Sequence, residues 1–92
     1  MAVQCASFQL GRVVITPNAL GQITPAEVQL GLQRHQAGDW GDLGEVDWQE
    51  NDNALRAGRR LLSSYRSAGG VTFWIITESD RSATTLLMPE DY

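Results

Sequence analysis

The sequence contains no lysine, one cysteine, one histidine and no long hydrophobic run. A single cysteine, Cys5, cannot form a disulfide within the chain, which is typical of proteins in a reducing compartment. The first ten residues, MAVQCASFQL, lack the basic start and unbroken apolar core of a signal peptide. No stretch approaches the roughly 18 apolar residues of a membrane-spanning helix. We therefore predict a cytoplasmic protein with no membrane partner.

The charge is unbalanced, because eleven acidic residues outnumber seven arginines and give a net charge of −4. Nucleic-acid-binding proteins usually carry a basic face, so phosphate binding is not the expected main task. The sequence also lacks a Ser-His-Asp order, a phosphate loop, zinc-ligand spacing and a glycine-rich dinucleotide turn. We therefore predict no catalytic residue, no cofactor and no metal site.

The length allows one domain over residues 1–92, and 42% of the residues are hydrophobic, which is typical of a folded globular protein. The order of the local patterns predicts an α+β fold with the elements β-α-α-β-β-β. We expect a small antiparallel sheet of about four strands with two helices packed on one face. A sheet of this size can leave an edge strand free, so a homodimer is compatible with the pattern, although nothing requires it.

The first half of the chain predicts one strand followed by two helical segments. Residues 8–16 (FQLGRVVIT) favour a strand, because valine and isoleucine are β-branched. Residues 17–21 (PNALG) can form one helical turn that starts at a proline and stops at a glycine. Thr24 and Glu27 have the spacing of a capping box, which predicts a longer helix over residues 25–37.

The second half predicts one helix and three strands. Asp47 is expected to cap a helix over residues 48–57, and Gly58 is expected to end it. Residues 67–70 (SAGG) are typical of a hairpin turn. The three strands are expected at residues 59–66, 71–78 and 82–88.

The middle of the chain, residues 38–53, carries six carboxylates, two tryptophans and no basic residue. Closely spaced carboxylates can occupy a groove that is built for phosphates, and an exposed tryptophan beside them can anchor an interface. The alternative is that both tryptophans fold inward and the acids only keep the surface solvated. The predicted partner-binding residues are Asp39, Trp40, Asp42, Glu45, Asp47 and Glu50.

Two other interpretations use different residues. A small hydrolase-like or nuclease-like enzyme would use His35 as a base, with Asp39 and Glu78 as its carboxylates. His35 falls on the apolar face of its predicted helix, however, where a buried structural histidine is also expected. A small regulatory module that binds nucleic acid would use an arginine face made of Arg56, Arg59, Arg60 and Arg81.

Three segments resemble a family of short bacterial proteins that are encoded on plasmids and other mobile genetic elements. They are GDWG (residues 38–41), WIITESDRS (74–82) and TTLLMPEDY (84–92), and the likeness covers nearly the whole chain. The resemblance implies an accessory protein of a mobile element and supplies no catalytic residues. Some small acidic proteins of such elements block host defence complexes, so it also implies an inhibitor of CRISPR or restriction machinery.

Overall fold

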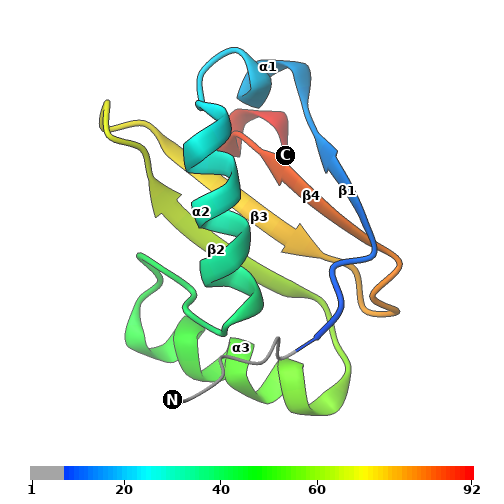
Figure 1. The fold of residues 1–92 in the computed structure, drawn as a ribbon. Helices are drawn as coiled ribbons and strands as arrows, with labels where there is room; N and C mark the ends of the chain where they lie inside the picture. The colour runs from blue at the N-terminus through cyan, green and yellow to red at the C-terminus, as the bar shows by residue number, and fades with distance from the viewer. Residues whose placement is uncertain (1–7) are drawn as a thin grey trace, which may run out of the picture.

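The computed structural model describes residues 8–92, so Cys5 and the segment tested for a signal peptide lie wholly or largely outside it. The described chain forms one four-stranded sheet with three α-helices and a short 3-10 helix (Figure 1). The predicted α+β class is confirmed, and the predicted order β-α-α-β-β-β is followed except that a short third helix lies at Pro17–Leu20, where one helical turn was expected. The elements are β1 (Arg12–Ile15), α1 (Pro17–Leu20), α2 (Pro25–Gln36), α3 (Glu45–Ala57), β2 (Leu61–Arg66), β3 (Thr72–Thr77), β4 (Ala83–Leu87) and the 3-10 helix η1 (Pro89–Asp91).

The strands lie in the order β1-β4-β3-β2. The antiparallel pairing expected from the sequence holds for β2 with β3 and for β3 with β4, which are joined by short turns. β1 instead runs parallel to β4, so the sheet is mixed. A hairpin forces its two strands to be antiparallel, whereas β1 and β4 are separated by all the other strands and helices and are free of that constraint.

α2 begins where its capping signal in the sequence predicts, whereas α3 begins earlier than its predicted cap. Thr24 Oγ1 accepts a hydrogen bond from the backbone N–H of Glu27, whose carboxylate accepts one from the Thr24 N–H, so the capping box is confirmed. α3 begins at Glu45, and its N-cap is Gly44 rather than Asp47. Carboxylates within the first helical turn are favoured by the helix dipole, so Asp47 is accommodated inside the helix.

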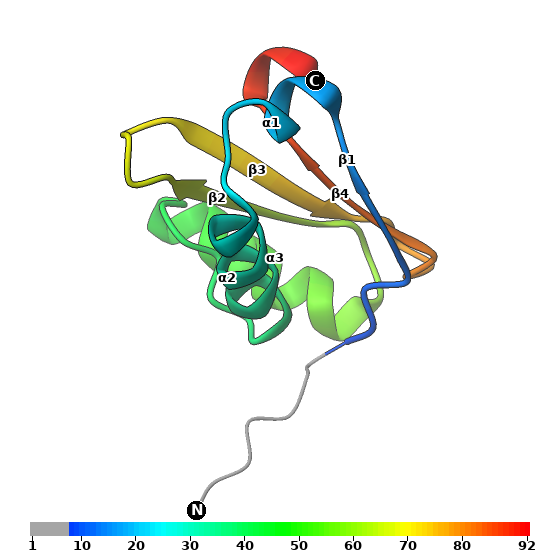
Figure 2. The same ribbon diagram turned by 45° about the horizontal axis from the view of Figure 1, so that its top comes forward.

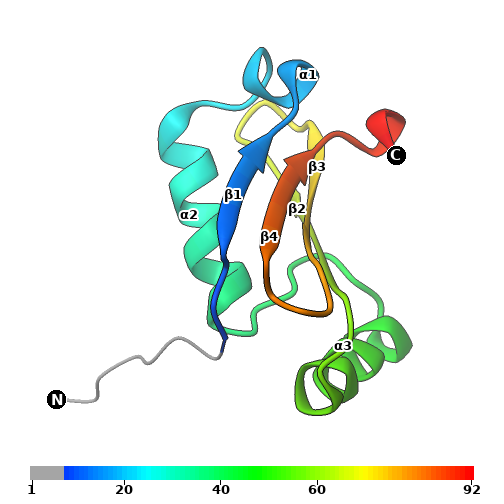
Figure 3. The same cartoon turned by 90° about the vertical axis from the view of Figure 1, so that its right-hand side faces the viewer.

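α2 packs across one face of the sheet, and α3 lies alongside the outer edge of β2 (Figures 1 and 3). Gly31 permits the close approach of α2, because an added Cβ would lie 3.2 Å from side-chain atoms of both Phe73 and Ile75. At the other end of the sheet, α1 and η1 lie side by side (Figure 2), and Thr16 donates a hydrogen bond to Asp91.

The core has two parts. The larger part lies between α2 and the sheet, and the smaller part lies under the loop before α3. The buried side chains of the larger part are Ala19, Ile23, Tyr65, Phe73, Ile75, Leu86 and Met88, and those of the smaller part are Trp40, Ala54 and Leu61.

Within residues 8–92, no helix is both long enough and apolar enough to cross a bilayer.

Candidate functional site

A single buried side chain, Asn51, fixes α3 to the edge of β2. Its amide nitrogen donates to the carbonyl oxygen of Leu62, and its amide oxygen accepts from the Leu62 N–H at 3.3 Å. The Asn51 amide therefore bonds to Leu62 as a neighbouring strand would, and satisfies backbone groups that would otherwise lack partners. This pairing joins the middle of α3 directly to the backbone of β2.

The loop before α3 is fixed to the same edge two residues further along. The Ser64 N–H donates to Trp40 O at 3.1 Å, and the Asp42 N–H donates to Ser64 O at 2.7 Å. Between them, Gly41 has a φ of +79°, and an added Cβ would lie only 2.1 Å from Ser64 O. Only glycine fits there. The acidic segment is therefore held on a rigid framework.

Trp40 faces inward. Its side chain is fully buried, and its indole Nε1 donates to Asp52 Oδ1 at 2.9 Å. The ring contacts Phe8 and His35, with centroid distances of 6.4 and 5.6 Å. The expectation that Trp40 is an exposed anchor is therefore corrected, and the inward-folding alternative describes it. The large apolar ring fills the smaller core while its polar N–H finds a partner on α3.

Asp39 is already paired. Its carboxylate accepts hydrogen bonds from Arg34 Nε at 2.8 Å and from the Gly41 N–H at 3.1 Å. The hydrogen bond from Arg34 lowers the pKa of the Asp39 carboxyl below its ordinary value, with further help from the Gly41 N–H. Because its charge is balanced by Arg34, Asp39 serves to hold the loop more than to attract a partner.

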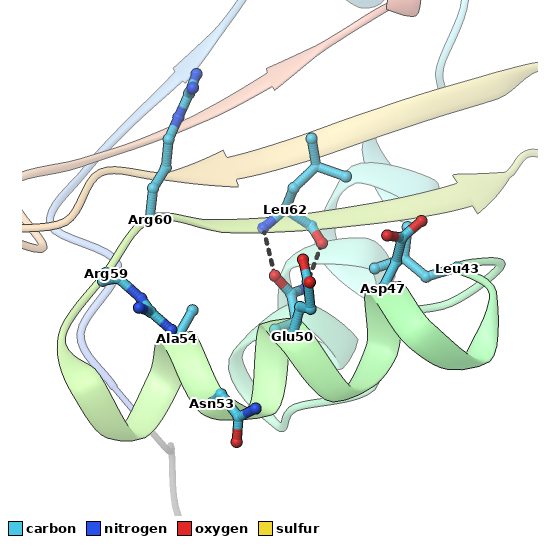
Figure 4. A pocket seen from close by; sticks show the side chains of 9 residues that line it. Leu43, Asp47, Glu50, Asn53, Ala54, Arg59, Arg60 and Leu62 are labelled. Atoms are coloured by element: carbon cyan, nitrogen blue, oxygen red, sulfur yellow. Dashed lines mark hydrogen bonds between the residues drawn. The ribbon is translucent and has the colours of Figure 1, made fainter.

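The other four predicted acids, Asp42, Glu45, Asp47 and Glu50, are exposed, and none takes part in a salt bridge within residues 8–92. Asp47 and Glu50 project from α3 into a groove of about 680 Å³ between that helix and β2 (Figure 4). Its apolar lining comes from Leu43, Ala54 and Leu62, and Arg59 and Arg60 lie at the opposite end from Asp47. The groove thus has an acidic end and a basic end.

The predicted arginine face is largely used within the molecule. Arg81 has a φ of +62°, and its Nη1 donates to the carbonyl oxygens of Arg59 and Glu78 at 2.7 and 3.1 Å. Arg60 donates to the hydroxyl of Tyr92 at 2.8 Å and lies 3.9 Å from the Glu78 carboxylate. Arg56 in turn bonds to Asn53. Of the four, only Arg59 has a guanidinium without a hydrogen bond or ion pair in the described part of the chain.

His35 lies at the centre of a buried chain of hydrogen bonds that fixes its tautomer. Thr84 Oγ1 donates to Leu10 O at 2.7 Å, so it must accept from Thr77 Oγ1, which lies 2.7 Å away. Thr77 then accepts from His35 Nε2 at 2.8 Å, which requires a proton on Nε2. The other ring nitrogen, Nδ1, accepts from the Ser63 hydroxyl at 2.5 Å.

The surroundings of His35 keep it neutral. Burial lowers the pKa of the imidazole to about 3, and the positive charge of Arg81 acts in the same direction. Both ring nitrogens bond to hydroxyl groups rather than to a carboxylate. Asp39 is bound to Arg34 and Glu78 is near Arg60, so the three residues of the enzyme interpretation have separate partners. His35 is therefore a buried structural histidine, which was the alternative left open by the sequence.

The sequence did not identify Leu62 as the backbone partner through which Asn51 anchors α3. A signal was present, because Asn51 shares a helix face with Trp48 and Leu55, where an apolar residue is normally expected. A polar amide on such a face needs partners for both its oxygen and its nitrogen. The pattern could not reveal that Leu62, eleven residues later, supplies both.

No family model, no curated protein and no solved structure matches this chain significantly. Within residues 8–92, no group of three or more histidine, cysteine, aspartate and glutamate side chains is placed to hold a metal ion.

Proposed function

We propose that the protein is a non-enzymatic interaction protein that binds a basic surface of a partner protein. The observation that carries this proposal is the set of exposed acids without salt-bridge partners in residues 8–92, on a loop and helix held rigidly against β2. A fixed backbone lowers the entropic cost of binding, because only the acidic side chains remain to be ordered when a partner arrives. The binding residues are Asp42, Glu45, Asp47 and Glu50.

The groove supports binding of an extended basic segment. Asp47 and Glu50 would pair with lysine or arginine side chains, and Leu43 and Leu62 would contact their aliphatic stems. Charged pairs of this kind speed encounter and set orientation more than they add raw affinity. Arg59 and Arg60, at the other end, disfavour a segment that is basic throughout its length. The preferred ligand therefore carries its basic residues at one end.

The resemblance to proteins of mobile genetic elements suggests the setting. Surfaces built to hold nucleic acid are basic, so an acidic protein can cover them and exclude the nucleic acid. In this proposal the partner is a host complex directed at nucleic acid, such as CRISPR or restriction machinery, and the protein inhibits it by occlusion in the cytoplasm. The arginine-face alternative is less favoured, because Arg81 and Arg60 are held by other groups of the chain.

The proposal can be tested with a defined probe before the partner is known. Titration of the purified protein with a fluorescent peptide, whose arginines all lie at one end and are followed by neutral residues, measures the affinity of the acidic groove for basic side chains. The double variant Asp47→Asn/Glu50→Gln should weaken binding by about 5- to 30-fold, since exposed ion pairs contribute roughly 0.5–1 kcal/mol each. The affinity of the wild-type protein should also fall as salt is added.

A double variant that binds the peptide as tightly as the wild-type protein would contradict the proposed site. Circular dichroism of the variant provides the control for folding, because both side chains are exposed and bear no structural hydrogen bond among the described residues. An affinity that does not change with salt would contradict the electrostatic mechanism itself.

A further inference from the structure

The two edges of the sheet are treated differently. At the β2 edge, Asn51, Trp40 and Asp42 bond to the outward-facing backbone groups of Leu62 and Ser64. At the β1 edge, no strand within residues 8–92 pairs with the outer side. Natural proteins generally block exposed strand edges, because an open edge pairs readily with another chain. Among the described residues, one edge of this sheet is blocked and the other is open.

The free backbone groups of β1 can be assigned from its pairing with β4. The N–H groups of Arg12 and Thr16 point inward and donate to Ser82 O and Leu86 O, each at 3.0 Å. Because backbone groups alternate in direction along a strand, the N–H and C=O groups of Val13 and Ile15 point away from β4. These four groups form the open ladder.

The open edge is apolar. Val13 and Val14 are 42% and 38% exposed, which is unusual for valines in the middle of a strand. Lysine, proline and inward-pointing charges commonly protect an edge, and Arg12 is the only charged residue of β1. The valine side chains therefore remain available for contact beside the free ladder.

An uncharged groove adjoins this edge. It lies between β1 and α2 and has a volume of about 510 Å³, and none of its lining residues within 8–92 is charged. Its polar lining consists of glutamines of α2, whereas the exposed acids of the proposed binding site lie at the opposite edge, beside β2. Its apolar lining includes Leu10, Ile15, Leu20, Ile23, Val28 and Leu32.

We propose that β1 pairs with β1 of a second copy of this chain, antiparallel about a two-fold axis at Val14. In this register Val14 faces Val14 of the second copy. Val13 faces Ile15 of the second copy, so that the outward N–H and C=O groups of these two residues can bond to each other. Arg12 faces Thr16, so no like charges oppose each other. The two four-stranded sheets become one sheet of eight strands.

A second copy suits this edge better than a charged partner does. Each chain carries a net charge of −4, so two copies repel unless they meet through a neutral surface. The β1 edge and its uncharged groove provide that surface, and a two-fold axis requires a patch that is complementary to itself. The dimer would place its two acidic grooves at opposite ends, which makes it bivalent toward repeated basic sites.

The test compares two valine variants of the full chain. Val14→Lys places like charges opposite each other at the axis, whereas Val46→Lys makes the same charge change at a valine of α3 that is 70% exposed and far from β1. Sedimentation equilibrium should give twice the chain mass of 10.1 kDa for the wild-type protein and for Val46→Lys. Val14→Lys should be a monomer with an unchanged circular dichroism spectrum.

Hydrogen exchange locates the contact. The amides of Val13 and Ile15 should exchange at least about tenfold more slowly in the concentrated wild-type protein than in dilute samples or in Val14→Lys. A wild-type protein that is monomeric at all concentrations would overturn the proposal. This holds even if another part of its own chain protects the two amides. A dimer that persists in Val14→Lys, or that leaves both amides unprotected, would also overturn it.

Discussion

Lowering the pH from 7.5 to 5 should destabilise the fold through His35. The imidazole is fully buried, and its pKa in the folded state is lowered to about 3 from an ordinary value of 6.5. Between these two values the unfolded chain binds a proton at this residue and the folded chain does not. The free energy of unfolding therefore decreases as the pH falls below 6.5 toward 3.

The size of the effect follows from the pKa difference. A pH of 5 is 1.5 units below the pKa of the imidazole in the unfolded state, which corresponds to about 2 kcal/mol of lost stability. This is a large share of the stability of a small domain. Protonation of the folded state is opposed by the hydrogen-bond chain as well as by burial, because Nδ1 already accepts from the Ser63 hydroxyl.

The assay is urea unfolding at both pH values for the wild-type protein and for His35→Gln. A glutamine side chain can donate to Thr77 and accept from Ser63 without titrating in this range. Carboxyl groups with lowered pKa values, such as Asp39, affect both proteins equally and act at lower pH. The wild-type protein should lose about 2 kcal/mol more than the variant. Equal losses in the two proteins would refute the buried neutral histidine.

Three further predictions concern the framework of the acidic segment. Asn51→Ala should lower the free energy of unfolding by about 1–3 kcal/mol, because it removes both bonds to Leu62, and urea unfolding should show a larger effect than for Asn53→Ala. Gly41→Ala should cost more than about 2 kcal/mol in the same assay because of the 2.1 Å clash with Ser64 O. Gly44→Ala should lower stability much less, because its added Cβ would have no atom of residues 8–92 within 4 Å. Arg34→Gln should raise the pKa of Asp39 toward its ordinary value, as followed by NMR titration. Equal effects of the paired variants, or an unchanged Asp39 titration, would contradict these contacts.

Local signals in the sequence determined much of the fold. The capping box at Thr24, the left-handed Gly58 at the end of α3 and the turn between β2 and β3 each depend on residues close together in the chain. The amphipathic position of His35 likewise pointed to burial. Such features can be predicted because their physical causes lie within one or two turns of the backbone.

Features that depend on distant residues could not be read in the same way. The direction of β1 depends on its pairing with β4, about seventy residues later. The burial of Trp40 depends on Phe8 and His35, and the anchoring of α3 depends on Leu62. The acidic composition of the middle segment was evident, but which acids are exposed and which are paired follows only from these tertiary contacts.

The most direct test of the proposed binding site compares two single variants that remove the same charge. Glu50→Gln and Glu90→Gln both change the net charge from −4 to −3, but only Glu50 lines the α3–β2 groove. The affinity for the peptide with its arginines at one end is measured for both at the same salt concentration. The proposal predicts about two- to fivefold weaker binding for Glu50→Gln and almost no change for Glu90→Gln. Equal changes in the two variants would show that only net charge matters, and would contradict a defined acidic site.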